Sequence, residues 1–218
     1  MSAAVNAAPK RKSVWRVRNI ALAGAVIALA VTMALDTRVV VIGSEEDVQA
    51  DVFSPEAFGD EQFPVIQELV EQRAVDAETL AAAIAEDKKA AGEQYGTPAG
   101  IGAVMPVRFT GVAGESKAGI YDVDVEGVPD EVRVRVQTGP AVNGTDLRDF
   151  PGTIAFGDFK NQIEYQNAGS GINNAVKKQV LAGIDNKALS GKTVNVTGVF
   201  KLINPKNWLV TPVRMSVE

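Results

Sequence analysis

The chain contains no cysteine and no histidine among its 218 residues. The absence of cysteine excludes disulfides, thiolate metal sites and cysteine nucleophiles. The absence of histidine excludes the Ser-His-Asp triad, histidine-based zinc sites and histidine acid–base catalysis. The glycine patterns of dinucleotide-binding and phosphate-binding loops are missing as well. We therefore predict a non-enzymatic protein without a metal or cofactor.

No acidic residue occurs among the first 35 residues, whereas five basic residues precede an uncharged apolar run over residues 20–35. This 16-residue run makes a helix of about 24 Å, and one more turn through Trp15 approaches the roughly 30 Å hydrocarbon core of a bilayer. The positive-inside rule places the N-terminus in the cytoplasm and the chain after Asp36 outside. We predict a single-pass cell-membrane protein with a basic cytosolic tail over residues 1–18 and a transmembrane signal-anchor in the lipid bilayer over residues 19–35.

Two other interpretations of the apolar run stay open. A cleavable secretory signal has an apolar region of about 7–15 residues before a small-residue cleavage site. Ala28-Leu29-Ala30 and Thr32-Met33-Ala34 are acceptable sites of this kind. The run is also long enough for a buried core helix, although basic residues on one side only favour a membrane segment.

Charge divides the rest of the chain into two parts. Residues 36–96 carry 15 acidic and 4 basic side chains, whereas residues 97–218 carry 12 acidic and 13 basic ones. Such blocks indicate separate structural units. We predict an acidic helical region over residues 36–98 and a second domain over residues 99–218.

The acidic region contains two amphipathic patterns. Pro64 fits the first turn of one helix, and Asp76 is a plausible N-cap for a second helix that ends at Gly92. Before them, a β-branched run over residues 38–42 predicts either a short strand or the exit from the membrane.

After residue 99 the hydrophobic period changes to two, which is typical of half-buried antiparallel strands. The predicted elements are strands over residues 104–112, 120–126 and 132–137, a helix over residues 165–182, and strands over residues 193–200 and 208–217. The order β-β-β-α-β-β is that of the OB-fold, a five-stranded Greek-key barrel. We therefore predict an α+β protein that ends in an OB-fold-like antiparallel barrel.

One segment concentrates amide, carboxylate and aromatic groups, the set that binds sugar hydroxyls and stacks on sugar rings. The polar and aromatic residues of this segment are predicted ligand contacts: Asp158, Asn161, Gln162, Glu164 and Tyr165. Arg148 and Trp208, outside the segment, are predicted contacts as well. The competing interpretation is structural. In it, Asp158 caps a helix, the amides satisfy backbone groups, and the aromatic rings pack in the core.

Three further groups carry weaker predictions. The same-face acids Asp122, Asp124 and Glu126 suggest either a weak Ca²⁺ site or ion pairs with the arginines of the next strand. Lysines 177, 178 and 187 are expected to be solvated surface. Glu164 is the best acid for a carboxylate-based glycan-acting enzyme, but no partner carboxylate is identifiable.

The fold alone also permits single-stranded nucleic-acid binding. That function needs a basic groove with stacking aromatics. The domain is near neutral and has few aromatics, so we predict no nucleic-acid partner.

Three segments resemble the DUF2291 family of predicted periplasmic lipoproteins: residues 144–149 (GTDLRD), 156–165 (FGDFKNQIEY) and 209–214 (LVTPVR). The resemblance runs from Arg38 to the C-terminus. It implies an extracytoplasmic OB-like domain of unassigned activity, often encoded beside sugar ABC transporters. The expected partners are therefore transporter subunits or a substrate-binding protein, and a small sugar-like ligand. Many members carry a lipidated cysteine where this chain has Asp36, so the apolar helix itself is expected to be the anchor.

Overall fold

The computed structural model describes residues 13–36 and 53–218, and the side chains of the first segment from Arg18 onward. Contacts divide the chain into two units, residues 1–52 and 53–218, which are considered separately. Most of the predicted cytosolic tail, residues 1–12, and the candidate strand over residues 38–42 lie outside the described residues.

Helix α1 spans Ser13–Asp36, 24 residues, which gives a length of about 36 Å. It begins ahead of the apolar run, so the extension through Trp15 is confirmed. Within the described residues, the stretch Arg18–Asp36 is the single one long and apolar enough to cross a membrane. All its side chains are exposed, whereas the helix of a soluble core is mostly buried.

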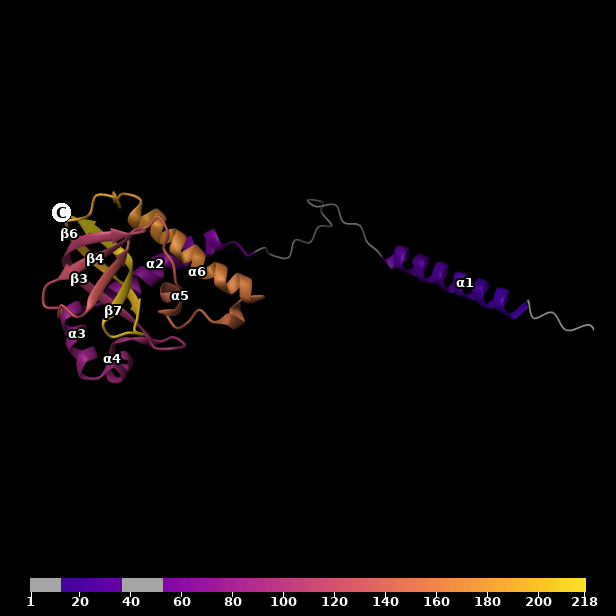
Figure 1. Cartoon of the computed structure of the whole chain (residues 1–218), viewed down its shortest axis with the longest axis horizontal. Helices are drawn as coiled ribbons and strands as arrows, with labels where there is room; N and C mark the ends of the chain where they lie inside the picture. The colour runs from indigo at the N-terminus through magenta and orange to yellow at the C-terminus, as the bar shows by residue number, and fades with distance from the viewer. Residues whose placement is uncertain (1–12, 37–52) are drawn as a thin grey trace, which may run out of the picture. The chain divides into compact units, whose positions relative to one another are not determined.

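Five long strands form the barrel of the second unit. They are β3 (Ala103–Lys117), β4 (Ile120–Val125), β5 (Arg133–Gln137), β6 (Thr193–Lys201) and β7 (Asn207–Val217). Their order is β3-β4-β5-β7-β6, and β6 pairs back with β3 to close the barrel. Strands β3, β4, β6 and β7 are labelled in Figure 1. Alternation decides which face is buried, as Val134 and Val136 point inward between exposed or half-buried arginines. The predicted positions of all five strands are confirmed.

The predicted antiparallel sheet is wrong in one pairing and in strand number. Strands β5 and β7 run parallel, with Val134 opposite Trp208, so the sheet is mixed. Two short strands, β1 (Val75–Asp76) and β2 (Thr97–Pro98), also pair with β3 and raise the total to seven. A period of two locates a strand but carries no information on its partner or direction.

A buried amide supports the parallel closure. Gln137 Nε2 donates to Thr211 Oγ1 at 2.8 Å and to the carbonyl of Asn143 at 2.9 Å. Its Oε1 accepts from the backbone N–H of Asn143 at 2.9 Å. Each of these three contacts satisfies a polar group that would otherwise be buried without a partner.

Helix α2 spans Pro55–Arg73 and begins two residues after the start of the second unit at Phe53. Ser54 is its N-cap, since its hydroxyl accepts from the backbone N–H of Ala57. Pro64 therefore lies inside α2 and not in a first turn, which corrects the prediction. The Ser54-Pro55 pair gave the stronger start signal, because both residues fit N-terminal positions.

The second predicted helix is two helices, α3 (Ala77–Glu86) and α4 (Lys88–Tyr95). The break lies at Asp87, whose carboxylate accepts from the backbone N–H groups of Lys89 and Ala90 and starts α4. Gly92 lies within α4 and does not end it. The sequence analysis missed Asp87 as an N-cap, because this residue lies within the apolar pattern that predicts one continuous helix.

The segment between β5 and β6 carries α5 (Asp146–Asp149), a 3₁₀ turn η1 (Phe156–Asp158), and α6 (Gln162–Val176), which continues as a π turn η2 (Lys177–Leu181). The inter-strand helix is thus confirmed. It begins three residues before the predicted start, because Asn161 accepts from Ile163 N and Glu164 N and caps it.

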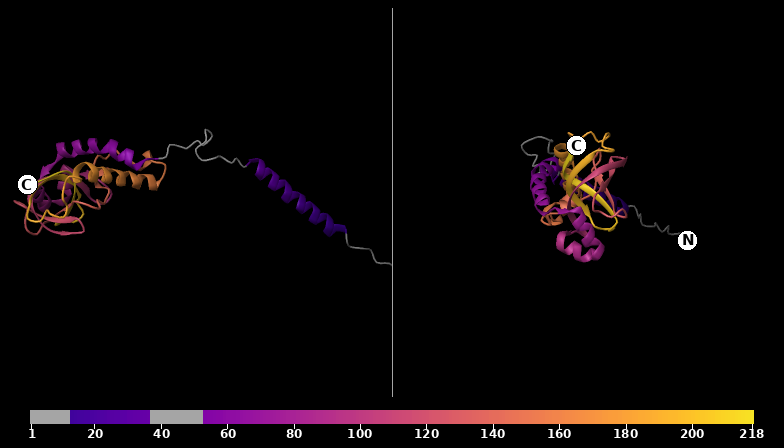
Figure 2. Two further views of the ribbon diagram at one scale, coloured as in Figure 1. Left: turned by 90° about the horizontal axis from the view of Figure 1, so that it is seen from above. Right: turned by 90° about the vertical axis from the view of Figure 1, so that its left-hand side faces the viewer.

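Helices α2 and α6 lie side by side on the barrel (Figures 1 and 2). Their crossing uses glycine: a Cβ on Gly171 would lie 1.9 Å from the carbonyl oxygen of Pro55, and one on Gly59 would lie 2.2 Å from that of Gly171. Phe63 and Ile172 then bury a second core between the helices and the strands. Residues of α3 and α4 join the barrel's own core. The predicted boundary near residue 98 therefore does not separate two compact units.

Candidate functional site

The structure gives local hydrogen bonds to the polar members of the predicted ligand segment. Asn161 caps α6 through its side-chain oxygen. Asp158 Oδ2 accepts from the backbone N–H of Ala155 at 2.8 Å, and Glu164 Oε2 accepts from that of Lys160 at 3.0 Å. Gln162 is exposed in the first turn of α6. Ligand binding by this segment stays a prediction, and the observed bonds match the structural interpretation.

Arg148 lies buried within an ion network. Its guanidinium donates from Nε and Nη2 to one carboxylate oxygen of Asp149, at 3.0 and 2.7 Å, and from Nη1 to the carbonyl of Tyr165 at 3.0 Å. The Arg148 Cζ stands 3.6 Å from the centroid of the Tyr165 ring. Lys201 Nζ adds a contact of 3.6 Å to Asp149 Oδ2. Arg148 therefore joins α5 to α6, and its donors serve the fold.

A second carboxyl lies beside this network. Burial raises the pKa of Asp146 above its ordinary value of 3.8, and the charge of Asp149 adds to the shift. The positive charge of Lys201 and a hydrogen bond from its backbone N–H oppose the shift.

Trp208 does not belong to a ligand site in this structure. Its side chain is fully buried, its ring stacks on Phe200 at 4.5 Å, and its Nε1 donates to the carbonyl of Pro205 at 2.9 Å. The stacking-platform prediction is therefore corrected: the indole fills the barrel core.

Among the three acids Asp122, Asp124 and Glu126, Asp122 forms an ion pair with the next strand. Arg133 donates from Nε and Nη2 to the two oxygens of Asp122 at 2.6 and 2.8 Å, which lowers the pKa of that carboxyl. No group of three or more acidic side chains in the described parts of the chain is placed to hold a metal ion. Of the three lysines expected on the surface, Lys178 pairs with Asp60 at 3.1 Å and with Glu56 at 3.7 Å.

Aromatic side chains gather at one end of the α2–α6 pair. The rings of Phe53, Phe58, Phe156, Phe159 and Tyr165 contact their neighbours with centroids 5.4–5.7 Å apart. Ile163, two residues before Tyr165 in the first turn of α6, is 68% exposed, and Phe156 is 51% exposed. These six residues are called the aromatic tip.

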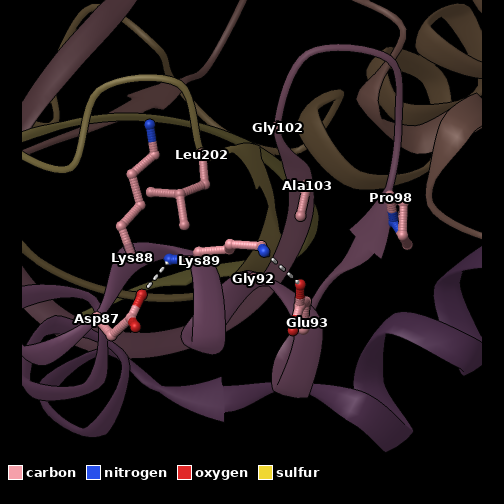
Figure 3. Close-up of a pocket in the computed structure, with 9 residues that line it drawn as sticks. All are labelled: Asp87, Lys88, Lys89, Gly92, Glu93, Pro98, Gly102, Ala103 and Leu202. Carbon is pink, nitrogen blue, oxygen red and sulfur yellow. Dashed lines mark hydrogen bonds and ion pairs between the residues drawn. The ribbon is translucent and has the colours of Figure 1, made fainter.

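A separate pocket of about 600 Å³ lies beside α4 (Figure 3). Its walls come from α4, from the hairpin that joins β2 to β3, and from the loop between β6 and β7. The lining residues are Asp87, Lys88, Lys89, Gly92, Glu93, Pro98, Gly102, Ala103 and Leu202. Ligand pockets have volumes of about 300–1,000 Å³. The loop between the fourth and fifth barrel strands is one that OB-folds use in binding.

Polar groups lie at the edge of this pocket. Lys88 Nζ donates to the carbonyl of Ile203 at 2.6 Å and joins α4 to the β6–β7 loop. Lys89 Nζ lies 3.8 Å from Glu93 Oε1 on the exposed surface. Gly102, Ala103 and Leu202 present mainly carbon atoms to the interior, so the pocket suits an apolar group better than a polyhydroxylated one.

Two isoleucines beside the pocket are exposed to solvent. Ile101 is 83% exposed and Ile203 is 57% exposed, and each is adjacent in sequence to a lining residue. Exposed apolar groups next to an apolar pocket are typical of interaction surfaces. Sequence reasoning missed this site. The available signals were Ile101 between Gly100 and Gly102, and Ile203 ahead of a turn.

Comparisons with known proteins agree with this fold. The family described as "Predicted periplasmic lipoprotein (DUF2291)" matches residues 25–216. The chain belongs to the DUF2291 family. An OB-fold protein from Thermotoga maritima, solved by crystallography, is similar to it with a TM-score of 0.60 and 18% sequence identity. That likeness covers 77% of this chain and 99% of the other. No curated protein matches the chain.

Membership of DUF2291 confirms the resemblance noted in the sequence, and the Thermotoga structure supports the barrel topology. The family description and α1 together indicate a membrane-associated, extracytoplasmic protein. Because this DUF2291 chain contains no cysteine, a thioether-linked lipid is excluded as its anchor.

Proposed function

We propose that this protein is a non-enzymatic accessory of a sugar-uptake transporter of the ABC type, held on the outer face of the membrane by α1. The observation that carries the proposal is the apolar pocket, together with the exposed Ile101 and Ile203 that adjoin its lining residues Gly102 and Leu202 in the sequence. In this reading the pocket receives an apolar side chain of a transporter subunit or of its substrate-binding protein.

The chemistry of the pocket favours a protein partner over a free sugar. Sugar sites need amide and carboxylate groups directed at hydroxyls. Here Lys88 is engaged with a backbone carbonyl, and Asp87 with the first N–H groups of α4. An isoleucine that becomes buried on docking contributes about 1.5–3 kcal/mol. Two such residues beside one pocket are enough to dominate a small interface.

The orientation in the membrane follows from charge. Five basic residues precede the apolar stretch, so the positive-inside rule places residues 53–218 outside the cytoplasm. A reporter that is active only outside the cytoplasm, fused after Glu218, should be active. The mature protein should also have the mass of the full chain, since α1 stays attached. Activity of a cytoplasm-dependent reporter alone contradicts the orientation, and loss of about 35 residues contradicts the anchor.

Co-purification tests the accessory role. The full chain, extracted from its own membranes in mild detergent, should recover transporter subunits or the substrate-binding protein. Ile203→Asp and Ile101→Asp should each reduce recovery about 10- to 150-fold, which corresponds to the burial free energy above. Val112→Asp is the matched control, because Val112 is 46% exposed and lies in β3 about 30 Å along the strand from the pocket.

Two results of the co-purification experiment contradict the proposal. Repeated failure to recover any transporter component across several sugars contradicts it. Equal loss of recovery with Val112→Asp contradicts the assignment of the pocket, because the effect would then follow from surface charge in general.

A further inference from the structure

The aromatic tip is a fixed feature of the fold. Glycine contacts hold α2 and α6 together at backbone distance, and Arg148 stacks on Tyr165 from the barrel side. Figure 2 shows both helices reaching beyond the barrel to the end where the second unit begins. Phe53, the first residue of that unit, is itself a member of the tip and contacts Phe58 and Phe159.

Phe156 and Ile163 leave much of their apolar surface in water although neighbouring rings are packed. An interior position would remove both side chains from solvent, yet they are 51% and 68% exposed. Aromatic and branched apolar residues that project from a rigid support are typical of surfaces that enter the membrane interface.

We propose that the aromatic tip contacts the outer face of the bilayer, with Phe156 and Ile163 entering the headgroup region. The inference rests on the anchorage by α1 and is independent of the transporter partner. Sixteen residues separate Asp36 from Phe53, so the tip attaches to the membrane helix through at most about 60 Å of chain. A tether of this length gives the tip a local concentration near the bilayer in about the millimolar range. At that concentration the insertion of two apolar side chains is enough to keep the tip bound to the bilayer.

Charge around the tip selects the lipid. Glu56 and Asp60 pair with Lys178, and the carboxylates of Asp158 and Glu164 accept local backbone hydrogen bonds. These four acidic side chains outnumber the basic Lys160 and Lys178, so the net charge around the tip gives no attraction for anionic headgroups. Insertion should therefore occur in zwitterionic phosphatidylcholine, and it should depend little on salt.

The chain's lack of cysteine permits a direct test. Gly157→Cys and Gly183→Cys each place a Cβ in open space, so both accept a fluorescent label without repacking. Gly157 belongs to η1 at the tip, whereas Gly183 follows η2, about 30 Å away along the 20 residues of α6 and η2. The labelled full chain is reconstituted into phosphatidylcholine vesicles that contain a lipid spin-labelled near its headgroup, which quenches fluorophores at that depth.

We expect at least twofold stronger quenching at residue 157 than at residue 183. Ile163→Asn should reduce quenching at residue 157 to the level of residue 183, and Phe156→Ser should have the same effect. The matched control is Val112→Asn, which removes another exposed branched apolar side chain, outside both the tip and the pocket, and should leave quenching unchanged. Ile163 is the safer variant, because its side chain contributes little buried surface.

Four results overturn the inference. The first is equal quenching at residues 157 and 183, and the second is quenching at residue 157 that survives both tip variants. The third is a label signal that changes with the number of protein copies per vesicle but is not quenched by the lipid, which assigns the tip to contact with a second copy. The fourth is a chain that does not float with the vesicles, which removes the anchorage as well. If residue 157 of the otherwise unchanged chain is not quenched but transporter subunits are still recovered by co-purification, the tip contact is rejected and the proposed function is not.

Discussion

Replacing Gly171 by alanine should separate the α2–α6 pair on which the tip depends. The new Cβ would lie 1.9 Å from the carbonyl oxygen of Pro55, and the next nearest atoms are also backbone. A relaxed contact needs about 3.5 Å, so the two helices must move apart by about 1.5 Å. No side-chain rotation relieves the overlap.

The size of the effect follows from two opposing contributions. Alanine in a helix interior is favoured over glycine by about 1 kcal/mol. Overpacking typically costs about 1–3 kcal/mol, and a backbone–backbone overlap exceeds that range because the core around Phe63 and Ile172 loses close contact on both sides. We expect Gly171→Ala to lower the free energy of unfolding by about 2–4 kcal/mol. For a unit of this size, that lowers the Tm by about 5–15 °C.

Gly169→Ala, two residues earlier on the same helix, is the control. Its Cβ would meet Thr145 Cγ2 at 3.6 Å, an ordinary contact, so the helix preference of alanine should raise stability by about 0.5–1 kcal/mol. Urea and thermal unfolding of the full chain in detergent, followed by far-ultraviolet circular dichroism, measures both variants. Changes of the same sign, or a Gly171→Ala variant as stable as the parent, would refute the close-crossing argument.

Two further predictions concern the buried charges. Burial raises the pKa of Asp146, so folding disfavours its charged form, and wild-type stability falls as pH rises from 3.8 through the folded value. Asp146→Asn keeps an acceptor for the Lys201 N–H without the charge. Its stability relative to wild type should therefore be higher at pH 7 than at pH 4 in urea titrations, and a difference independent of pH counts against the assigned shift. Arg148→Ala leaves the buried Asp149 with Lys201 as its remaining ion-pair partner and the Thr145 hydroxyl as a donor, and it should cost about 3–5 kcal/mol. Truncating the exposed Arg108 should change the Tm far less. Arg148→Lys should restore only part of that loss, because an ammonium neither forks onto Asp149 nor stacks on Tyr165, and full recovery of the Tm argues against both contacts.

The barrel could be predicted to a large extent from local alternation. Val132, Val134 and Val136 alternate with polar residues, and the structure buries the last two of these valines. The parallel pairing of β5 with β7 was beyond reach, because it joins segments with no shared local signal. The start of α6 was available: Asn161 followed three residues later by Glu164 is an N-terminal signature.

The candidate site was harder to predict than the fold. The predicted segment is rich in groups that also cap helices, and composition does not distinguish capping from binding. The walls of the pocket come from α4, the β2–β3 hairpin and Leu202, which are far apart in the sequence. Trp208 was predicted to stack on a ligand, because an aromatic side chain with a polar N–H at the start of a strand can serve that purpose. Its complete burial, which the sequence does not show, excludes that role.

The place of β7 in the sheet sets a condition on how the protein comes to fold. The last strand lies between β5 and β6, and the buried bond from Gln137 reaches Thr211, 74 residues onward. A growing chain therefore cannot close its barrel until β7, Asn207–Val217, has been made. Until then β5 and β6 both keep an unpaired edge. A chain with this connectivity has to be kept from associating with others during export, and a nonsense change within the last dozen codons should be as damaging as one much earlier.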